Sequence, residues 1–285
     1  MKKQRRQIEL GRIPELISTG KPPAYLEKES NEKSRVVESL KSYQIIETKY
    51  GKLSLLCPNK MAEFRARTFH EKEPETLEWI DSIGKEETLW DIGANVGLYS
   101  LYAAQKGLKV LAFEPSPANY HLLNSNIEKN CLYNSISAYC LAFSVKTELG
   151  SFYMASSEPG AALNSFGNAV DWQGKPFEHA MRQGMIAFSI DDFIEQFAPA
   201  IPNHVKIDVD GIEPMILRGA SSLLSNDSLL SLQVELDYGN EKHAYTVIEH
   251  LKKFGFETIS KSHAEMFENS EFSNVYNVLF KRNKL

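Results

Sequence analysis

The apolar and polar positions from about residue 87 onward follow two alternating periods. Short apolar runs predict strands, and apolar residues spaced three and four apart predict helices. The expected order is strand 87–93, helix 97–105, strand 109–114, helix 117–129, strand 134–143, strand 204–210, helix 213–224, strand 229–236, helix 243–254 and a closing pair of strands at 256–260 and 274–280. This alternation predicts an α/β domain with a mostly parallel sheet and helices on both faces.

The chain before this alternation has a different pattern. Residues 1 to about 43 look helical and polar. Residues 43–57 predict a β-hairpin, and residues 73–84 predict a short helix that begins at a proline. We therefore expect an N-terminal helical and hairpin extension over residues 1–67 and a main domain over residues 68–285.

Residues 155–184 interrupt the main domain with little periodicity and many small side chains. An irregular segment of this length is usually a binding loop or a lid, so we expect it on the substrate side. Its aromatic residues Phe166, Trp172 and Phe177 could stack on a sugar, cover an apolar acceptor or anchor the loop. The sequence leaves these alternatives open.

Composition narrows the classes of protein. The 285 residues are 42% hydrophobic and 24% charged, as in ordinary globular proteins. A net charge of −5 argues against a polyanionic partner, so we expect no nucleic acid to bind. Residues 1–7 (MKKQRRQ) are nevertheless basic. The three cysteines form no C-x-x-C pair and fit a reducing compartment. Without a signal sequence or an apolar run of membrane length, the expected location is the cytoplasm, with no membrane span.

A glycine-rich turn follows the first strand of the main domain. Residues 91–97 read D-x-G-x-N-x-G, which is neither the G-x-G-x-x-G nor the G-x-x-x-x-G-K-[ST] pattern. Gly93 and Gly97 permit unusual backbone angles and a close approach of a ligand, while Asp91 and Asn95 can hold the turn or bind that ligand. Ligands of such sheets bind beyond the carboxyl ends of the strands.

An acidic residue ends the second strand of the main domain. Glu114 closes the run KVLAFE, one strand–helix unit after Asp91. A carboxylate in this place can accept both ribose hydroxyls of an adenosine. The glycine turn and Glu114 together therefore predict a nucleoside site.

These motifs resemble those of a known family. DIGANVGLYSL with AFEPSPANYHLLNSNI resembles the cofactor site of class I S-adenosylmethionine-dependent methyltransferases, and FSIDDFI with VKIDVDGIEPMILRGA resembles the FkbM-type family. The resemblance implies a Rossmann-like fold, with a mostly parallel seven-stranded sheet and an antiparallel last strand. It also implies S-adenosylmethionine as the cofactor and O-methylation of a hydroxyl on a sugar, glycan or natural product.

The resemblance also implies roles for individual residues. Asp91, Gly93, Asn95 and Gly97 would surround the methionine part of the cofactor, and Glu114 would bind the ribose. The residues that it implies around the adenine are Pro115, Ser116, Ala142 and Phe143, and the residue that it implies at the reacting end of the cofactor is Asp208. The family often has an aspartate shortly after Phe143, where this chain has Ser144 and Val145, so Ser144 or a carbonyl group would replace it.

Charged residues alternate with apolar ones in the strands at 204–210 and 229–236. Lys206, Asp208 and Asp210 share one face, and so do Gln233, Glu235 and Asp237. A buried face carrying three charges is costly unless the charges are paired or used. Asp208 and Glu235 should meet at the cofactor edge.

Three interpretations of these charges stay open. The first is a structural ion pair of Lys206. The second is acid–base catalysis by Asp208, Glu235 or a Lys206 whose pKa burial has lowered. The third is Mg²⁺ held by Asp208, Glu235 and Asp237. We assign no metal ligand.

The histidines are scattered and include no H-E-x-x-H pattern, although His179 and His243 lie near the expected site. Other functions remain as alternatives. They are a nucleic-acid or protein methyltransferase, a nicotinamide oxidoreductase and a degenerate nucleotide-binding scaffold. The sequence decides neither the acceptor nor the oligomeric state.

Overall fold

The computed structural model describes residues 33, 36, 40–171 and 173–283. Most of the segment expected to be helical before residue 43, including the basic residues 1–7, lies outside these residues, as does Trp172. From Tyr43 onward the chain forms one compact unit.

The predicted hairpin is confirmed. Strands β1 (Tyr43–Thr48) and β2 (Gly51–Leu56) pair antiparallel. Three helices follow, which are α3 (Lys60–Arg67), α4 (Phe69–Lys72) and α5 (Pro74–Ser82). The buried side chain of Asn126 accepts a hydrogen bond from the Leu56 backbone N–H and so ties β2 to the main domain.

The central sheet has seven strands in the order β12-β13-β11-β10-β3-β4-β5. The strands are β3 (Thr88–Ile92), β4 (Lys109–Phe113), β5 (Ile136–Tyr139), β10 (His204–Ile207), β11 (Ser231–Asp237), β12 (Phe256–Ser262) and β13 (Val275–Arg282). Strands β11, β10, β3, β4 and β5 are parallel, and the last strand, β13, runs antiparallel to both its neighbours. The predicted fold class, that of class I methyltransferases, is confirmed.

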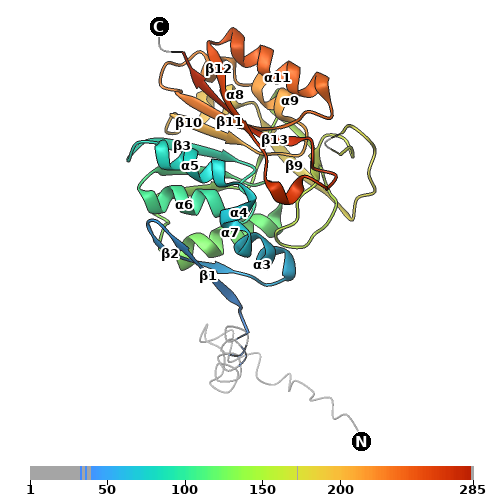
Figure 1. The fold of residues 1–285 in the computed structure, drawn as a ribbon. Coiled ribbons are helices and arrows are strands. Elements are labelled where there is room, and N and C mark those ends of the chain that lie inside the picture. The colour runs from blue at the N-terminus through green and yellow to red at the C-terminus, as the bar shows by residue number, and fades with distance from the viewer. Residues whose placement is uncertain (1–32, 34–35, 37–39, 172, 284–285) are drawn as a thin grey trace, which may run out of the picture. The chain divides into compact units, whose positions relative to one another are not determined.

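Helices cover both faces of this sheet (Figure 1). One face packs on the hairpin, α5, α6 (Leu98–Lys106) and α7 (Pro117–Lys129), and the other on α8 (Ile190–Phe197), α9 (Glu213–Arg218), α10 (Ser221–Leu224) and α11 (Glu241–Lys253). In β3, Leu89 belongs to the first core and Trp90 to the second. Every residue of β3 is therefore buried, as expected for a central parallel strand.

Two predicted elements are split. The strand expected at 134–143 is β5 followed by β6 (Ala142–Phe143), which leaves the central sheet. The helix expected at 213–224 is α9 and α10, separated at Gly219. Gly219 packs closely on the chain just after β6, because a Cβ on Gly219 would lie 2.5 Å from the Ser144 carbonyl oxygen.

A second sheet was not expected. Strands β6, β9 (Met181–Phe188), β7 (Glu148–Met154) and β8 (Asn164–Phe166) lie in that order. The prediction that residues 155–184 are irregular is therefore wrong for β8 and for the start of β9. Both strands pair with β7, so their pairing depends on contacts distant in sequence rather than on local periodicity.

The closing strands β12 and β13 are joined by residues 263–274, which include the short helix η2 (Glu265–Phe267). The ends of β3, β4, β10 and β11 and this connection all border one pocket. No helix in the described part of the chain is long and apolar enough to cross a membrane.

Candidate functional site

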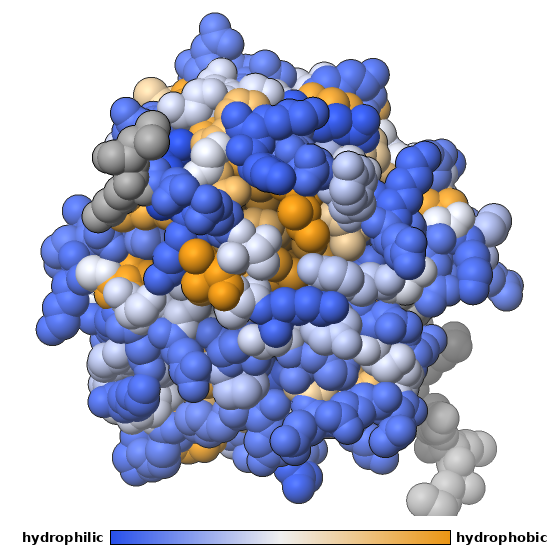
Figure 2. All heavy atoms as spheres, turned by 45° about the horizontal axis from the view of Figure 1, so that its top comes forward, coloured by the Kyte–Doolittle hydropathy of each residue, from blue (hydrophilic) through white to orange (hydrophobic). Residues whose placement is uncertain are grey.

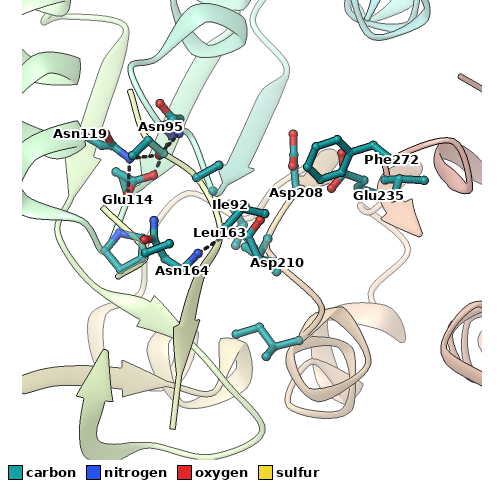
Figure 3. Close-up of a pocket in the computed structure, with 18 of the residues that line it drawn as sticks. Ile92, Asn95, Glu114, Asn119, Leu163, Asn164, Asp208, Asp210, Glu235 and Phe272 are labelled. Atoms are coloured by element: carbon teal, nitrogen blue, oxygen red, sulfur yellow. Dashed lines mark hydrogen bonds between the residues drawn. The ribbon is translucent and has the colours of Figure 1, made fainter. Parts of the chain in front are cut away.

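A pocket of about 500 Å³ lies at the carboxyl ends of the parallel strands (Figure 3). Eight of the predicted site residues line it, namely Gly93, Asn95, Glu114, Pro115, Ala142, Phe143, Asp208 and Glu235. The other four, Asp91, Gly97, Ser116 and Lys206, are not among the lining residues and are buried or part of the supporting turn. On the face drawn in Figure 2, apolar residues gather in a central hollow ringed by hydrophilic ones.

The glycine turn is built by close backbone contacts. Gly93, Asn95 and Gly97 have φ values of +88°, +51° and +90°. A Cβ on Gly93 would lie 1.9 Å from the Asp208 carbonyl oxygen, and one on Gly97 would lie 2.4 Å from Leu123. Only glycine fits these two positions, and α6 begins after Gly97 without a side-chain cap.

Asp91 supports the turn from beneath. Its side chain is 1% exposed and accepts a hydrogen bond from the Ser100 hydroxyl. Burial raises the pKa of Asp91, although the Lys206 charge and the Ser100 bond oppose this. Asp91 therefore holds the start of α6 against the end of β3 rather than lining the pocket.

Glu114 is buried at the end of β4 and is 4% exposed. Its Oε2 accepts from the Asn95 backbone N–H at 2.8 Å, and its Oε1 accepts from the Ser116 backbone N–H at 2.8 Å. Burial raises the pKa of Glu114 to about 7 despite these donors. A carboxylate has about four lone-pair sites, so Glu114 can accept a further hydrogen bond from a ligand.

The residues expected around adenine come together at the end of β4 and in β6. Pro115, Ala142 and Phe143 line the pocket, and the Phe143 ring packs 4.8 Å from that of Phe113. Ser144 is buried, its hydroxyl has no partner and it does not line the pocket. The suggestion that its side chain replaces the family's aspartate therefore has no support.

Residues 158–164, here called the strap, cross the pocket. Asn95 Nδ2 and Asn119 Nδ2 both donate to the Ala161 carbonyl oxygen, at 2.9 and 3.0 Å. Asn119 Oδ1 accepts from the Gly160 N–H, and the Asp210 carboxylate accepts from the Asn164 N–H at 2.7 Å. The strap thus links the glycine turn to the end of β10, as the dashed lines of Figure 3 show.

Four alternating charges run from α4 to the end of β10. Lys72 Nζ lies 2.8 Å from Glu73 Oε1, Lys206 Nζ lies 3.5 Å from Glu73 Oε2, and Lys206 also pairs with Asp208. Lys206 and Glu73 are 2% and 4% exposed. The Lys206 ion pair is therefore present and involves two carboxylates.

The pKa of Lys206 is raised, whereas a lysine that acts as a base needs a lowered pKa. Burial by itself lowers it, but the charges of Asp208, Glu73 and Asp91 outweigh burial and hold the pKa well above its usual range. The alternative in which burial lowers the pKa of Lys206 and makes it a base therefore finds no support. Burial likewise raises the pKa of Glu73, yet Lys206 and Lys72 hold it well below its usual range.

Two further carboxyl groups border the same space. Burial and the Asp208 charge raise the pKa of Glu235 well above its usual value. Burial raises the pKa of Asp210 to about 7, against the hydrogen bond from Asn164. The site thus combines Asp208, which is paired with a cation, with two carboxyl groups whose protonated forms are favoured.

The magnesium interpretation finds no support. Asp208 is engaged by Lys206, and Asp237 Oδ1 accepts from the Gly239 N–H at 2.7 Å. Among the residues described, no three His, Cys, Asp or Glu side chains are arranged to hold a metal ion.

The two histidines near the expected site have structural surroundings. His243 is buried, with Nε2 2.8 Å from Glu213 Oε2, and His179 is exposed beside the Tyr153 ring. Neither lines the main pocket.

Sequence reasoning missed several polar residues of the pocket. These are Arg65, Lys72, Glu73, Asn119, His263 and Asn277. Glu73 looked like an ordinary acid at a helix start, but its side chain makes no capping bond to α5. The one available signal was the surplus of charge on the faces of β10 and β11, which requires partners from elsewhere.

Comparisons with known proteins identify the family to which the chain is similar. The chain matches the methyltransferase FkbM domain family over residues 91–277. It is similar to the hexuronic acid methyltransferase AglP of Haloferax volcanii, at 23% identity over 155 residues, 54% of this chain and 59% of that protein. It is also similar to the methyltransferase sdnD of Sordaria araneosa, at 28% identity over 151 residues, covering 45% of this chain and 58% of that protein.

Both matches span less than two thirds of the relative's length. Among solved structures, the M. jannaschii tRNA m1G37 methyltransferase superposes with a TM-score of 0.44 at 14% identity, over 86% of this chain and 58% of that one.

Proposed function

The chain belongs to the methyltransferase FkbM family, and from this premise we propose that it transfers a methyl group from S-adenosylmethionine to a hydroxyl oxygen of a sugar, glycan or natural product. The observation that supports the proposal is that two groups of residues line the same pocket. The glycine turn with Glu114 suits a nucleoside, and Asp208 with Glu235 suits a hydroxyl that must lose a proton.

The residues present fit the cofactor in three respects. Gly93 lines the pocket without a side chain, so a ligand can approach the backbone of the turn. Glu114 is buried and accepts three hydrogen bonds from the protein, two on Oε1 and one on Oε2, which leaves a lone-pair site on Oε2 for a ribose hydroxyl. Asn95 Oδ1 is buried without a partner, which suits an ammonium donor such as that of the methionine moiety.

The bound cofactor would supply an electrophilic methyl group, and the protein would bind, align and accept a proton. We assign Asp208 as the group that takes the proton of the attacking hydroxyl onto a carboxylate oxygen. Lys206, held by Glu73, fixes the Asp208 side chain. Glu235 in its protonated form would donate a hydrogen bond to a neighbouring oxygen of the acceptor. Alignment of the reacting atoms would supply most of the rate enhancement.

A sugar acceptor is supported by one relative and by the site. AglP is named a hexuronic acid methyltransferase. The pocket combines carboxyl groups with the apolar surfaces of Phe166, Phe267 and Phe272, a mixture that suits a sugar ring. Absence of nucleic acid among the substrates stays a prediction from the net charge.

The first experiment is calorimetric binding of S-adenosylmethionine and S-adenosylhomocysteine to the wild type and to Glu114→Ala, with and without Mg²⁺. We expect micromolar binding and no effect of Mg²⁺. The variant should lose about 30-fold or more in affinity, since a charge-assisted hydrogen bond to the ribose is removed. Absence of binding to folded wild-type protein would reject the proposal.

Transfer of labelled methyl to neutral sugars, uronic acids and RNA then separates the acceptor classes. Labelling of RNA in a salt-dependent manner would favour the nucleic-acid alternative.

A further inference from the structure

Beyond Asp208 the pocket continues along three strand ends, whose residues other than Glu235 take no part in the methyl transfer proposed above. Glu235 on β11 stands opposite Asn277 on β13, and Asn277 stands opposite Ser262 on β12. Side chains directly opposite in antiparallel strands share a face and have Cβ atoms about 4.5–5.5 Å apart. With His263, which follows Ser262, these residues form what we call the acceptor row, and all four line the pocket.

Asn277 is fixed by a partner outside the pocket. Its Nδ2 donates to Glu75 Oε1 at 2.8 Å, and its side chain is among the buried ones. A carboxylate only accepts hydrogen bonds, so this contact determines which end of the amide is the donor. The other end, Oδ1, is buried without a partner and is a hydrogen-bond acceptor.

His263 shows the same arrangement. Its Nδ1 lies 2.9 Å from the Val275 carbonyl oxygen, so Nδ1 must carry the hydrogen. In the neutral ring Nε2 is then an acceptor, and it too is buried without a partner. The Tyr276 ring, 5.0 Å away, holds the imidazole in place.

The two unpartnered atoms therefore both require donors. An unpaired buried polar atom is unfavourable, and a hydrogen-bond donor from a ligand would remove this cost. The connection 263–274 lines the pocket beside them. Phe267 and Phe272, from this connection, give an apolar surface; Figure 3 shows Phe272 beside Glu235 and Asp208.

The cationic side chains described in the pocket lining are already engaged within the protein, which disfavours an anionic ligand. These residues are Lys72 and Arg65. Lys72 is already paired with Glu73, and Arg65 donates through Nε to the Gly160 carbonyl oxygen at 2.6 Å. A ligand rich in hydroxyl donors and without negative charge meets these conditions.

We infer that the acceptor row is the sugar-binding subsite, and that it takes the uncharged, hydroxyl-rich face of a hexose ring whose O–H groups donate to Asn277 and His263. The inference rests on the methyl transfer proposed above and narrows its acceptor to neutral sugars. It distinguishes this chain from a protein that binds a hexuronate through its carboxylate.

The test is saturation-transfer NMR on the full chain saturated with S-adenosylhomocysteine. The probes are methyl β-D-glucopyranoside, methyl β-D-galactopyranoside and methyl β-D-glucuronide. The variants are Asn277→Leu and His263→Phe, which keep side-chain volume or aromatic packing but remove the acceptor atom. The matched controls are Asn283→Leu and His121→Phe, at exposed positions.

We expect transfer to at least one neutral hexoside, weaker transfer to the glucuronide, and at least a threefold loss in each variant but in neither control. Stronger transfer to the glucuronide, no transfer to either hexoside, or equal signals in all variants would overturn the inference. Calorimetric binding of S-adenosylhomocysteine is measured first on every protein. Its absence in the wild type would instead reject the proposed function, and its retention in the variants shows that they are folded.

Discussion

The polar groups on the cofactor side of the pocket come from a short stretch of chain, whereas those on the acceptor side come from segments far apart. We call residues 91–97 with 114–116 the cofactor half, and Glu73, Lys206, Asp208 and the acceptor row the acceptor half. In the cofactor half, backbone N–H groups satisfy Glu114. In the acceptor half, Lys206 on β10 pairs with Asp208 and with Glu73, which lies far earlier in the chain, before α5. Figure 3 shows Asn95 and Glu114 apart from Asp208 and Glu235.

This difference predicts how each half of the pocket responds to a substitution. A half built from backbone geometry should lose ligand binding when an added side chain obstructs the backbone. Its polar chemistry depends on one carboxylate, that of Glu114. In a half built from paired side chains, removing one partner leaves a buried charge unpaired and shifts the pKa of the neighbouring groups. The following substitutions test this distinction, from the largest expected effect to the smallest.

The largest effect is expected for Gly93→Ala. The substitution combines a φ of +88° with a Cβ position 1.9 Å from the Asp208 carbonyl oxygen. We expect no detectable S-adenosylhomocysteine binding by calorimetry and a loss of about 3 kcal/mol or more of unfolding free energy in urea. The control is Gly174→Ala, with a φ of +76° but no atom within 4 Å. It should lose at most about 2 kcal/mol and bind normally. Normal binding by Gly93→Ala would mean that the turn is not rigid.

The second effect separates the two carboxyl groups of the acceptor half. Asp208→Asn should lower kcat by about 10²–10⁴ because the proton acceptor is removed. Glu235→Gln should lose less than about tenfold, since an amide still donates a hydrogen bond as a protonated carboxyl group does. Initial rates of S-adenosylhomocysteine release, with the KM for the cofactor measured alongside, provide the readout. The reverse order of the two losses would make Glu235 the base.

How much of this could be predicted from sequence differs between the halves. Asp91 to Gly97 and Glu114 are read from local spacing, because close backbone approach leaves glycine as a local signature. All of them were placed at the correct strand ends. Asn277 carries no such signature, since its orientation is set by Glu75 some two hundred residues earlier in the chain.

The errors in the fold have the same origin. β8 is three residues long and pairs with β7 across the strap, so it is too short to show the hydrophobic alternation of a strand. The sequence left open whether burial lowers the pKa of Lys206, because local sequence does not place Glu73 beside it. Long-range pairing therefore decides both the extra sheet and the chemistry of the acceptor half.

The third effect concerns pH and the cofactor half. Burial raises the pKa of Glu114 from 4.5 to about 7, a change that corresponds to about 3 kcal/mol. A carboxyl group whose pKa is raised on folding stabilises the fold below its unfolded pKa, and that stability is lost as pH rises through the folded pKa. Glu114→Gln should therefore raise the unfolding free energy of the cofactor-free protein at pH 8 and change it little at pH 5.

Thermal unfolding of both proteins between pH 5 and pH 8 checks this. The difference in Tm should grow with pH in favour of the variant, although the variant binds the cofactor poorly. A constant difference, or a less stable variant at pH 8, would show that the backbone donors fully compensate burial.

The smallest effect is expected where the strap joins the two halves. Asn119 holds Gly160 and Ala161 by two hydrogen bonds, each worth about 0.5–1.5 kcal/mol, while Asp210 holds Asn164 at the other end. Asn119→Ala should speed S-adenosylhomocysteine dissociation about 3- to 10-fold in stopped-flow measurements, and Asn124→Ala, at an exposed position on the same helix, should not. Because the strap is anchored in both halves, loosening one anchor should also weaken binding of a neutral hexoside. If dissociation speeds up while hexoside binding is unchanged, the strap serves the cofactor half alone, and the two halves are independent.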